Sequence, residues 1–247
     1  MSTPSPDSFS LIKNETQTIE QEGFGFIAAK TMASILGEAV LKHWGIFAES
    51  WDNLGDDRYM ADAGRYRRRK YAVFAVDANT ITRKPHQPHY QSRDYNPLNG
   101  DIERWFAPMD ESTLANPVFI VLMQWARATI THLTPKDFIP QTWHAEIHQF
   151  RIEANQQFQG KPTPEGMHRD GVDWVFVVMI NRKNIEEGTT IILDIQRQPL
   201  GSFTLLNPLD TVIVNDNRVF HGVTPIKPQD QNHPAYRDVL VLTFRHQ

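Results

Sequence analysis

The clearest structural pattern in the chain lies in residues Asn207–Ile226, NPLDTVIVNDNRVFHGVTPI. Short runs rich in β-branched residues, at Thr211–Asn215 and Gly222–Ile226, follow turn-forming Asn, Asp and Pro, which predicts two strands. The same pattern extends to both sides. We predict further strands at about Trp143–Ala154, Asp173–Ile180, Thr189–Gln196, Ser202–Leu206 and Arg237–Phe244. A series of short strands separated by turns indicates a sandwich or a barrel.

Helical patterns precede this β-rich part. Apolar residues recur at helical spacing over about Ala28–Trp44, and Gly45 follows as a stop signal. A second helix is predicted from Asn116 to about Leu133, because Asn116 is a good N-cap and Pro117 suits the first helical position. We expect both helices to pack on the β core.

The segment Thr82–Ile102 contains three prolines and is predicted to be a loop. A loop of this length in a compact domain is typical of a lid or a binding loop. We expect a flexible Pro/Ser-rich tail over residues 1–20 and a single domain over residues 21–247. In that domain, a helical and loop part extends to about residue 142, and the β core covers residues 143–247.

Composition restricts the possible chemistry. The chain has 247 residues, a formal net charge of -4 and no Cys, so any metal must be bound by His, Asp or Glu. The longest apolar runs are too short to cross a membrane, and the first residues do not resemble a secretory signal. Because the net charge is negative, we expect no nucleic-acid partner. We expect no membrane partner and a cytoplasmic location.

One candidate metal site combines His168 and Asp170 of GMHRDG with His221 of VFHGVTP. Two residues placed two apart on a strand project from the same face, so His168 and Asp170 can reach one ion. Two imidazoles and one carboxylate on one face of an octahedral ion are typical of non-haem Fe(II) oxygenases. Roughly one His-x-Asp pair is expected by chance in a chain of this composition, so the pair alone is weak evidence.

The segment HAEIH offers an alternative metal set. On a strand, His144, Glu146 and His148 would share one face. The order is not that of the zinc-protease motif HExxH, because the Glu does not directly follow the first His.

Four segments carry a resemblance to a known family. They are PEGMHRDG at Pro164–Gly171, VMINRKNIEEGTTIILD at Val178–Asp194, the stretch Asn207–Ile226, and RDVLVLTF at Arg237–Phe244. The chain resembles the iron(II)- and 2-oxoglutarate-dependent dioxygenases, and among them the bacterial group typified by L-isoleucine dioxygenase, which hydroxylates free L-amino acids. This resemblance implies a mainly β fold with some α, in which N-terminal helices flank a double-stranded β-helix, the jelly-roll or cupin-like core.

The resemblance also implies the roles of several residues. His168, Asp170 and His221 match the family's iron ligands. Arg237 matches the arginine that holds the distal carboxylate of 2-oxoglutarate, and Arg245 is an alternative on the same side of the last strand. Many members of the wider superfamily have Ser where this chain has Val239, so a second hydrogen-bond donor to the co-substrate must come from elsewhere.

Residues that contact the substrate are harder to identify. Gln149 and Arg151 share a strand face just upstream of the predicted ligands, and either can meet a carboxylate of substrate or co-substrate. The alternative for Arg151 is that it points outward to solvent. In the basic cluster RYRRRK, Tyr66 with Arg68, or Arg67 with Arg69, would enter the pocket, and a solvated strand face is the alternative. The remaining candidates are Trp174 and Phe176 as an apolar wall or as ordinary core aromatics, and Glu165 and Asp173 as partners of an amine or as turn residues.

The implied function is hydroxylation of a free aliphatic L-amino acid of the isoleucine, leucine or methionine type. The cofactor and co-substrates would be Fe(II), 2-oxoglutarate and O2, and the products the hydroxy-amino acid, succinate and CO2. The protein's partner would be the small-molecule amino acid, with a homodimer as a further possibility. Two alternatives remain open: the same chemistry on a carrier-bound or modified amino acid, and a jelly roll that binds a metal without oxygen chemistry.

Overall fold

The computed structural model describes residues 13–60, 64–96, 98 and 100–247. The helical elements are α2 (Lys13–Glu22), α3 (Ala29–Leu36), α4 (Glu38–Leu41), α5 (Trp44–Glu49), η1 (Ser50–Asn53), α6 (Glu111–Leu114), α7 (Pro117–Leu133) and η2 (Lys136–Phe138). The strands are β1 (Phe24–Ile27), β2 (Gly55–Asp56), β3 (Arg67–Val76), β4 (Ile81–Arg83), β5 (Trp143–Ala154), β6 (Trp174–Lys183), β7 (Ile185–Glu187), β8 (Thr189–Asp194), β9 (Pro199–Thr204), β10 (Thr211–Asn215), β11 (Val219–Val223), β12 (Ile226–Pro228) and β13 (Ala235–His246).

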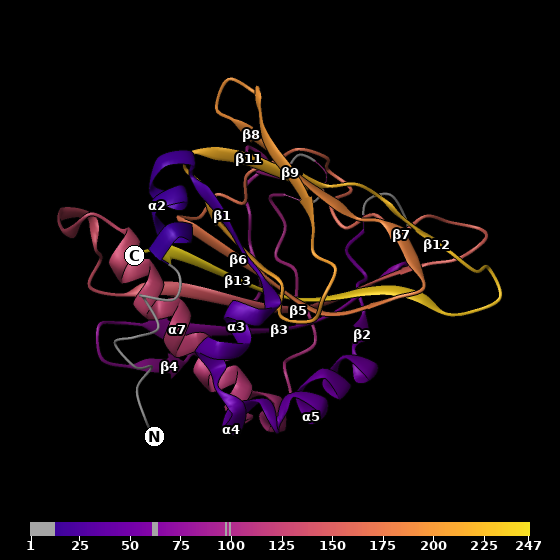
Figure 1. Ribbon diagram of the computed structural model, residues 1–247, viewed down its shortest axis with the longest axis horizontal. Helices are drawn as coiled ribbons and strands as arrows, with labels where there is room; N and C mark the ends of the chain where they lie inside the picture. Colours follow the sequence, from indigo (N-terminus) through magenta and orange to yellow (C-terminus); the bar gives the residue numbers. More distant parts are fainter. Residues whose placement is uncertain (1–12, 61–63, 97, 99) are drawn as a thin grey trace.

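The strands form a large antiparallel sheet and a smaller opposing layer. The large sheet has the order β1-β10-β6-β13-β5-β3-β2, and β4 pairs with β3. The opposing layer consists of β11-β8-β9 and the pair β12-β7. Figure 1 shows the helices gathered on one side of the large sheet and strands β8, β9 and β11 on the other. This is the predicted jelly-roll core with flanking helices, and the fold prediction is confirmed.

Helix α7 is stabilised by the signals that predicted it. Asn116 is the N-cap, its side-chain oxygen accepts a hydrogen bond of 2.9 Å from the Val118 amide, and Pro117 occupies the first turn. The helix buries Leu122 and Trp125 in the core between the helices and the large sheet. Each such side chain contributes roughly 1.5–3 kcal/mol on burial. The prediction of a helix over residues 116–133 is therefore confirmed.

Two predictions near the N-terminus are wrong. The helix expected over residues 28–44 is divided into α3, α4 and the start of α5, because Gly37 has φ 77°, outside the helical region. The tail expected over residues 1–20 is too long. Residues 13–22 form helix α2, which buries Ile19 completely in the core. Residues 1–12 lie outside the described residues.

Most predicted strands are present, and two of them need correction. Strands β5 and β10 have the predicted bounds. The strand expected at Gly222–Ile226 instead ends at Val223, and a separate strand starts at Ile226. Pro225 has no N–H to continue a ladder, and the Thr224 hydroxyl accepts a hydrogen bond from the Thr189 amide at this break. Strand β9 starts at Pro199 rather than at residue 202.

The two faces of the large sheet have different environments. The face toward the helices carries the larger apolar cluster, which includes Ile147, Phe176 and Leu242. The face toward the small sheets carries a second apolar cluster, which includes Val175, Val212 and Val239. Strand alternation therefore decides whether a side chain enters the core beneath the helices or the space between the sheets.

No described helix has the length and apolar character that crossing a membrane requires.

Candidate active site

His168, Asp170 and His221 converge between the sheets. The backbones of His168 and His221 form an isolated antiparallel bridge, with N–H to O distances of 3.0 and 2.9 Å, and their ring centroids are 4.6 Å apart. The Asp170 carboxylate lies 3.6 Å from His168 Nε2 and 3.4 Å from His221 Nε2. One potential ligand atom from each residue lies within 4.8 Å of the others, a spacing that one metal ion can bridge. The expected convergence is confirmed, although His168 and Asp170 lie on a bridged loop and not on a regular strand.

Asp216 holds the turn that presents Asp170. Its carboxylate accepts hydrogen bonds from the amides of Asp170 at 2.9 Å, Gly171 at 2.8 Å and Val172 at 3.1 Å. Gly171 has φ 77°, and a Cβ there would lie 2.6 Å from the Tyr95 ring. The turn therefore needs a glycine. Asp216 lies in the NDN turn after β10 and was not among the site residues predicted from the sequence.

The imidazole of His168 is oriented for a metal. Its Nδ1 lies 2.9 Å from the Gly166 carbonyl oxygen and donates a hydrogen bond to it, which leaves Nε2, the nitrogen that faces Asp170, for a metal. This orientation is the one commonly found in histidine ligands.

The electrostatics of the group favour a cation. Burial disfavours both charged forms, but hydrogen bonding and charge attraction outweigh it. They raise the pKa of His168 to about 9 and hold the pKa of Asp170 well below its ordinary value. Protons stabilise this cluster when no metal is bound, and a divalent cation would replace them.

A cavity of about 140 Å³ extends from this group to Arg237. Its walls are apolar and come mainly from valines of β6, β10 and β13: Val175, Val177, Val212, Val214, Val239 and Val241. Arg237 is 3% exposed, and its Nε and Nη2 atoms have no hydrogen-bond partner among the described residues. Burial lowers its pKa to about 10. A buried guanidinium without an anion fits a site for the carboxylate of a bound molecule.

Arg245, the alternative anchor, lines a different cavity. It is exposed near the end of β13, and this cavity of about 130 Å³ reaches Asp170 from the side of His89 and Tyr90. The geometry therefore favours Arg237 for a carboxylate bound between the sheets.

Four residues proposed for substrate contact are on the wrong side of the large sheet. Gln149 faces the helices, where its side-chain amide donates to Ser50 Oγ at 2.9 Å. Arg151 also points to that side, and its guanidinium pairs with Asp238 at 2.7 Å. Trp174 and Phe176 are buried in the core beneath the helices, which confirms the alternative of ordinary core aromatics and excludes the pocket wall. These assignments are wrong because they choose the opposite phase of the strand alternation.

The choice within the basic cluster is also corrected. Tyr66 is buried in a small apolar cluster with Ile152, away from the predicted ligands, and Arg68 points outward to pair with Asp56 and Glu153. Arg67 and Arg69, which were the other option, face the space between the sheets and line a cavity beside Asp170. Strand β3 thus presents its charged residues on both faces.

Glu165 and Asp173 have different positions. Glu165 lines the cavity, with its Oε1 atom 3.5 Å from His168 Nε2, and its Oε2 atom is buried without a described hydrogen-bond partner. Asp173 accepts hydrogen bonds from His246 and Asn217 at the surface, which is the turn role considered for it.

The HAEIH side chains also face the inner side of the sheet. Together with His89, the residues Glu146 and His148 have ligand-type atoms within 4.8 Å of one another. Arg69 Nη2, however, lies 2.8 Å from His148 Nδ1. Arginine only donates, so Nδ1 accepts this bond and the proton of the neutral imidazole is on Nε2, the nitrogen that points to Glu146. This arrangement is a polar network and does not suit a second metal site.

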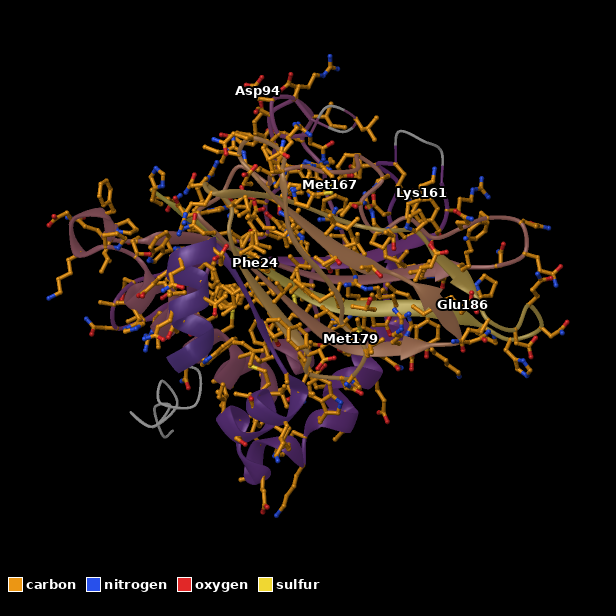
Figure 2. The ribbon with its side chains drawn as sticks, turned by 45° about the horizontal axis from the view of Figure 1, so that its top comes forward. Phe24, Asp94, Lys161, Met167, Met179 and Glu186 are labelled. Atoms are coloured by element: carbon orange, nitrogen blue, oxygen red, sulfur yellow. The ribbon has the colours of Figure 1, made fainter. Side chains whose placement is uncertain are left out.

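The predicted loop lies over the site. Gln91 donates a hydrogen bond of 2.8 Å to the Asp170 carbonyl, and His89 and Arg104 form a backbone bridge within the loop region. Figure 2 shows Asp94 of this loop on the same side of the molecule as Met167, away from the helices. Its position agrees with the expectation of a binding loop.

Comparisons with known proteins identify the family. The family model described as 2OG-Fe dioxygenase matches residues 48–243. An L-isoleucine-4-hydroxylase of Bacillus thuringiensis is 27% identical over 248 residues, which cover 95% of each chain. A 3(1)-hydroxy-L-isoleucine 4-dioxygenase of Pantoea ananatis is 30% identical over 162 residues, which cover 64% of this chain and 64% of that protein. The crystal structure of a bsmA homolog from Methylobium petroleophilum is similar with a TM-score of 0.85 and 32% identity, and the match covers 95% of this chain and 92% of that one.

The family match covers most of the chain and includes all the residues that converge between the sheets. The partly buried His/Asp/His group suits Fe(II), and the unpartnered guanidinium of Arg237 suits the distal carboxylate of 2-oxoglutarate. The chain therefore belongs to the 2OG-Fe dioxygenase family, whose enzymes use Fe(II), 2-oxoglutarate and O2.

Proposed function

We propose that the protein hydroxylates a free aliphatic L-amino acid of the isoleucine, leucine or methionine type, with conversion of 2-oxoglutarate and O2 into succinate and CO2. The observation that carries this proposal is the partly buried His168, Asp170 and His221 group at one end of a valine-walled cavity, with the unpartnered Arg237 at its other end. The names of the relatives from Bacillus thuringiensis and Pantoea ananatis support an isoleucine-type substrate. A cytoplasmic location and a homodimer stay predictions.

In this proposal His168, Asp170 and His221 hold Fe(II), and Arg237 holds the distal carboxylate of 2-oxoglutarate. With these groups bound, the iron and the co-substrate supply the oxidising power that hydroxylates an unactivated C–H bond. The protein positions the substrate and keeps water away from the reacting groups. The valine walls exclude water from the cavity, and the triad fixes where the reacting C–H bond must lie.

The second donor to 2-oxoglutarate is assigned to Thr190. Val239, at the position where many relatives have Ser, has no donor, but it lines the same cavity as Thr190 of the opposing strand β8. Thr190 is 4% exposed, so its hydroxyl can serve a buried ligand.

The test is anaerobic reconstitution with Fe(II) and 2-oxoglutarate, followed by oxygen and each of the twenty L-amino acids. Succinate and product mass are measured. We expect an aliphatic amino acid to gain one oxygen atom with matching succinate. Succinate without a hydroxylated amino acid would redirect the search to modified or carrier-bound substrates. An absence of succinate from folded, metal-loaded protein would contradict the oxygenase activity itself.

A further inference from the structure

A second, smaller cavity of about 90 Å³ adjoins the metal group on the side of the binding loop. The two cavities share five lining residues and meet at the predicted iron site: Arg67, Phe150, Glu165, Asp170 and Val241. Its far side differs from the valine walls. There Arg69 of β3 and Arg104 of the loop region line one small space, and Arg67 borders it from the wall that both cavities share.

The three guanidinium groups are not balanced by the carboxylates that they contact. Asp57 is the ion-pair partner of two of them, at 2.7 Å from Arg67 and 3.5 Å from Arg69. Arg104 is 2% exposed and makes no ion pair among the described residues; its Nη2 donates to the neutral Gln91 side chain at 3.2 Å. Mutual repulsion also contributes to the lowered pKa values of Arg69 and Arg104, after the larger effect of burial. Among the described residues, the three guanidinium groups therefore have one ion-pair partner between them, Asp57, while Glu146 and Glu165 are further carboxylates that line the same cavity.

A second carboxylate on this side, Glu146, already accepts hydrogen bonds from neighbouring side chains. Glu146 accepts hydrogen bonds from Tyr71 at 2.9 Å and from His89 at 2.7 Å, and His144 lies 3.2 Å from it. Two buried donors remain without a described partner, the Nε atoms of Arg69 and Arg104. Arg69 is also held rigidly, because its guanidinium lies between the rings of Phe106 and Phe150, at 3.6 and 4.4 Å. Fixed, unpartnered donors in a buried cavity suit a carboxylate.

A negative group is also available in the same cavity. The Oε2 atom of Glu165 is buried and has no described hydrogen-bond partner. Phe150, Val172 and Val241 add apolar surface to the lining of the same cavity. Cationic donors, one free carboxylate oxygen and an apolar wall beside the metal group match the three parts of an aliphatic amino acid.

We infer that Arg69 and Arg104 bind the α-carboxylate of the amino-acid substrate and that Glu165 binds its α-ammonium group, so that the side chain extends toward the iron site. This inference rests on the proposed function and adds the residues that recognise the substrate. It also explains why the basic cluster is buried: Arg69 provides the anion-binding wall, and the outward-facing Arg68 does not contribute to it.

The test measures binding separately from turnover. The enzyme is loaded with Fe(II) and 2-oxoglutarate under anaerobic conditions. Isothermal titration calorimetry then gives the Kd of L-isoleucine and of L-isoleucinamide, which lacks the carboxylate. We expect the wild type to prefer the acid and Arg104→Met to weaken its binding about ten- to a hundredfold, with little change for the amide. Glu165→Gln should raise the Kd of L-isoleucine and leave the Kd of 3-methylpentanoate, which lacks the amine, nearly unchanged.

Arg68→Met is the matched control, because Arg68 neighbours Arg69 on β3 but points outward, and it should change neither Kd more than about twofold. Arg104→Lys keeps the charge without the planar donor fork and replaces Arg104→Met if that variant does not fold; it should also reduce the preference for the acid. Unchanged preference for the acid over the amide in a folded Arg104 variant would overturn the inference, as would failure of the wild type to bind isoleucine, leucine and methionine. If the wild type binds isoleucine through Arg104 but forms no hydroxylated product, the recognition site stands and the proposed reaction fails.

Discussion

Replacement of Arg237 by Met should have opposite effects on stability and on co-substrate binding. Arg237 is buried and unpartnered, and burial lowers its pKa from the ordinary value of 12.5 to about 10. The folded state thus disfavours the charged form, a cost of about 3 kcal/mol that is fully present below pH 10 and is relieved as the pH rises from there toward the ordinary value. Met keeps most of the aliphatic stem. Without co-substrate, Arg237→Met should therefore raise the free energy of unfolding at pH 7 by up to about 3 kcal/mol.

The same substitution should weaken the binding of 2-oxoglutarate. Loss of a charge-assisted hydrogen bond of about 1.5–3 kcal/mol corresponds to a ten- to hundredfold higher KM for the co-substrate. Denaturant unfolding with and without 2-oxoglutarate, on protein loaded with a divalent metal, measures both effects. We expect the co-substrate to stabilise the wild type and not Arg237→Met. A variant that is several kcal/mol less stable without co-substrate, yet is still stabilised by it, would refute the reasoning and make Arg237 a structural residue.

The remaining predictions concern the metal group, its support and the corrected strand face. His168→Ala and Asp170→Ala should abolish turnover with unchanged circular dichroism, and near-normal activity of either would mean that the ligands are misassigned. Asp216→Asn should weaken Fe(II) binding about ten- to a hundredfold in equilibrium dialysis, since three turn amides lose a charged acceptor, and unchanged binding would argue against its positioning role. Arg151→Met should lower the midpoint of urea unfolding, because it leaves the buried Asp238 without its partner, while the KM values for 2-oxoglutarate and amino acid stay constant. A large rise in either KM would place Arg151 in the site after all.

The sequence predicted the metal group better than the substrate contacts, for a physical reason. His168, Asp170 and His221 lie in segments with family-like patterns, so their convergence did not depend on knowing a strand's orientation. The substrate contacts depended on strand phase. In β3, consecutive arginines occupy both faces, so no polar and apolar alternation shows that Arg69 points inward and Arg68 outward.

Other features could not be predicted because their partners are distant in the chain. Arg104 is an ordinary loop residue in the sequence, and only the fold places it beside Arg69. Asp216 looks like a turn residue, although its carboxylate binds amides 44–46 positions earlier. The break at Gly37 follows from a backbone angle outside the helical region, while the apolar spacing continues across it.

The two cavities are lined by different parts of the chain, so the residues that bind 2-oxoglutarate and those that bind the amino acid can change separately. The valine walls and Arg237 belong to strands in the last third of the chain, whereas Arg104, Gln91 and His89 come from the loop region that precedes α7. Side chains on loops tolerate replacement more readily than paired strands do. Mutant libraries confined to residues 84–104 should therefore yield enzymes with altered substrate choice that still consume 2-oxoglutarate, so that natural or laboratory evolution can exchange the substrate without rebuilding the oxidising centre.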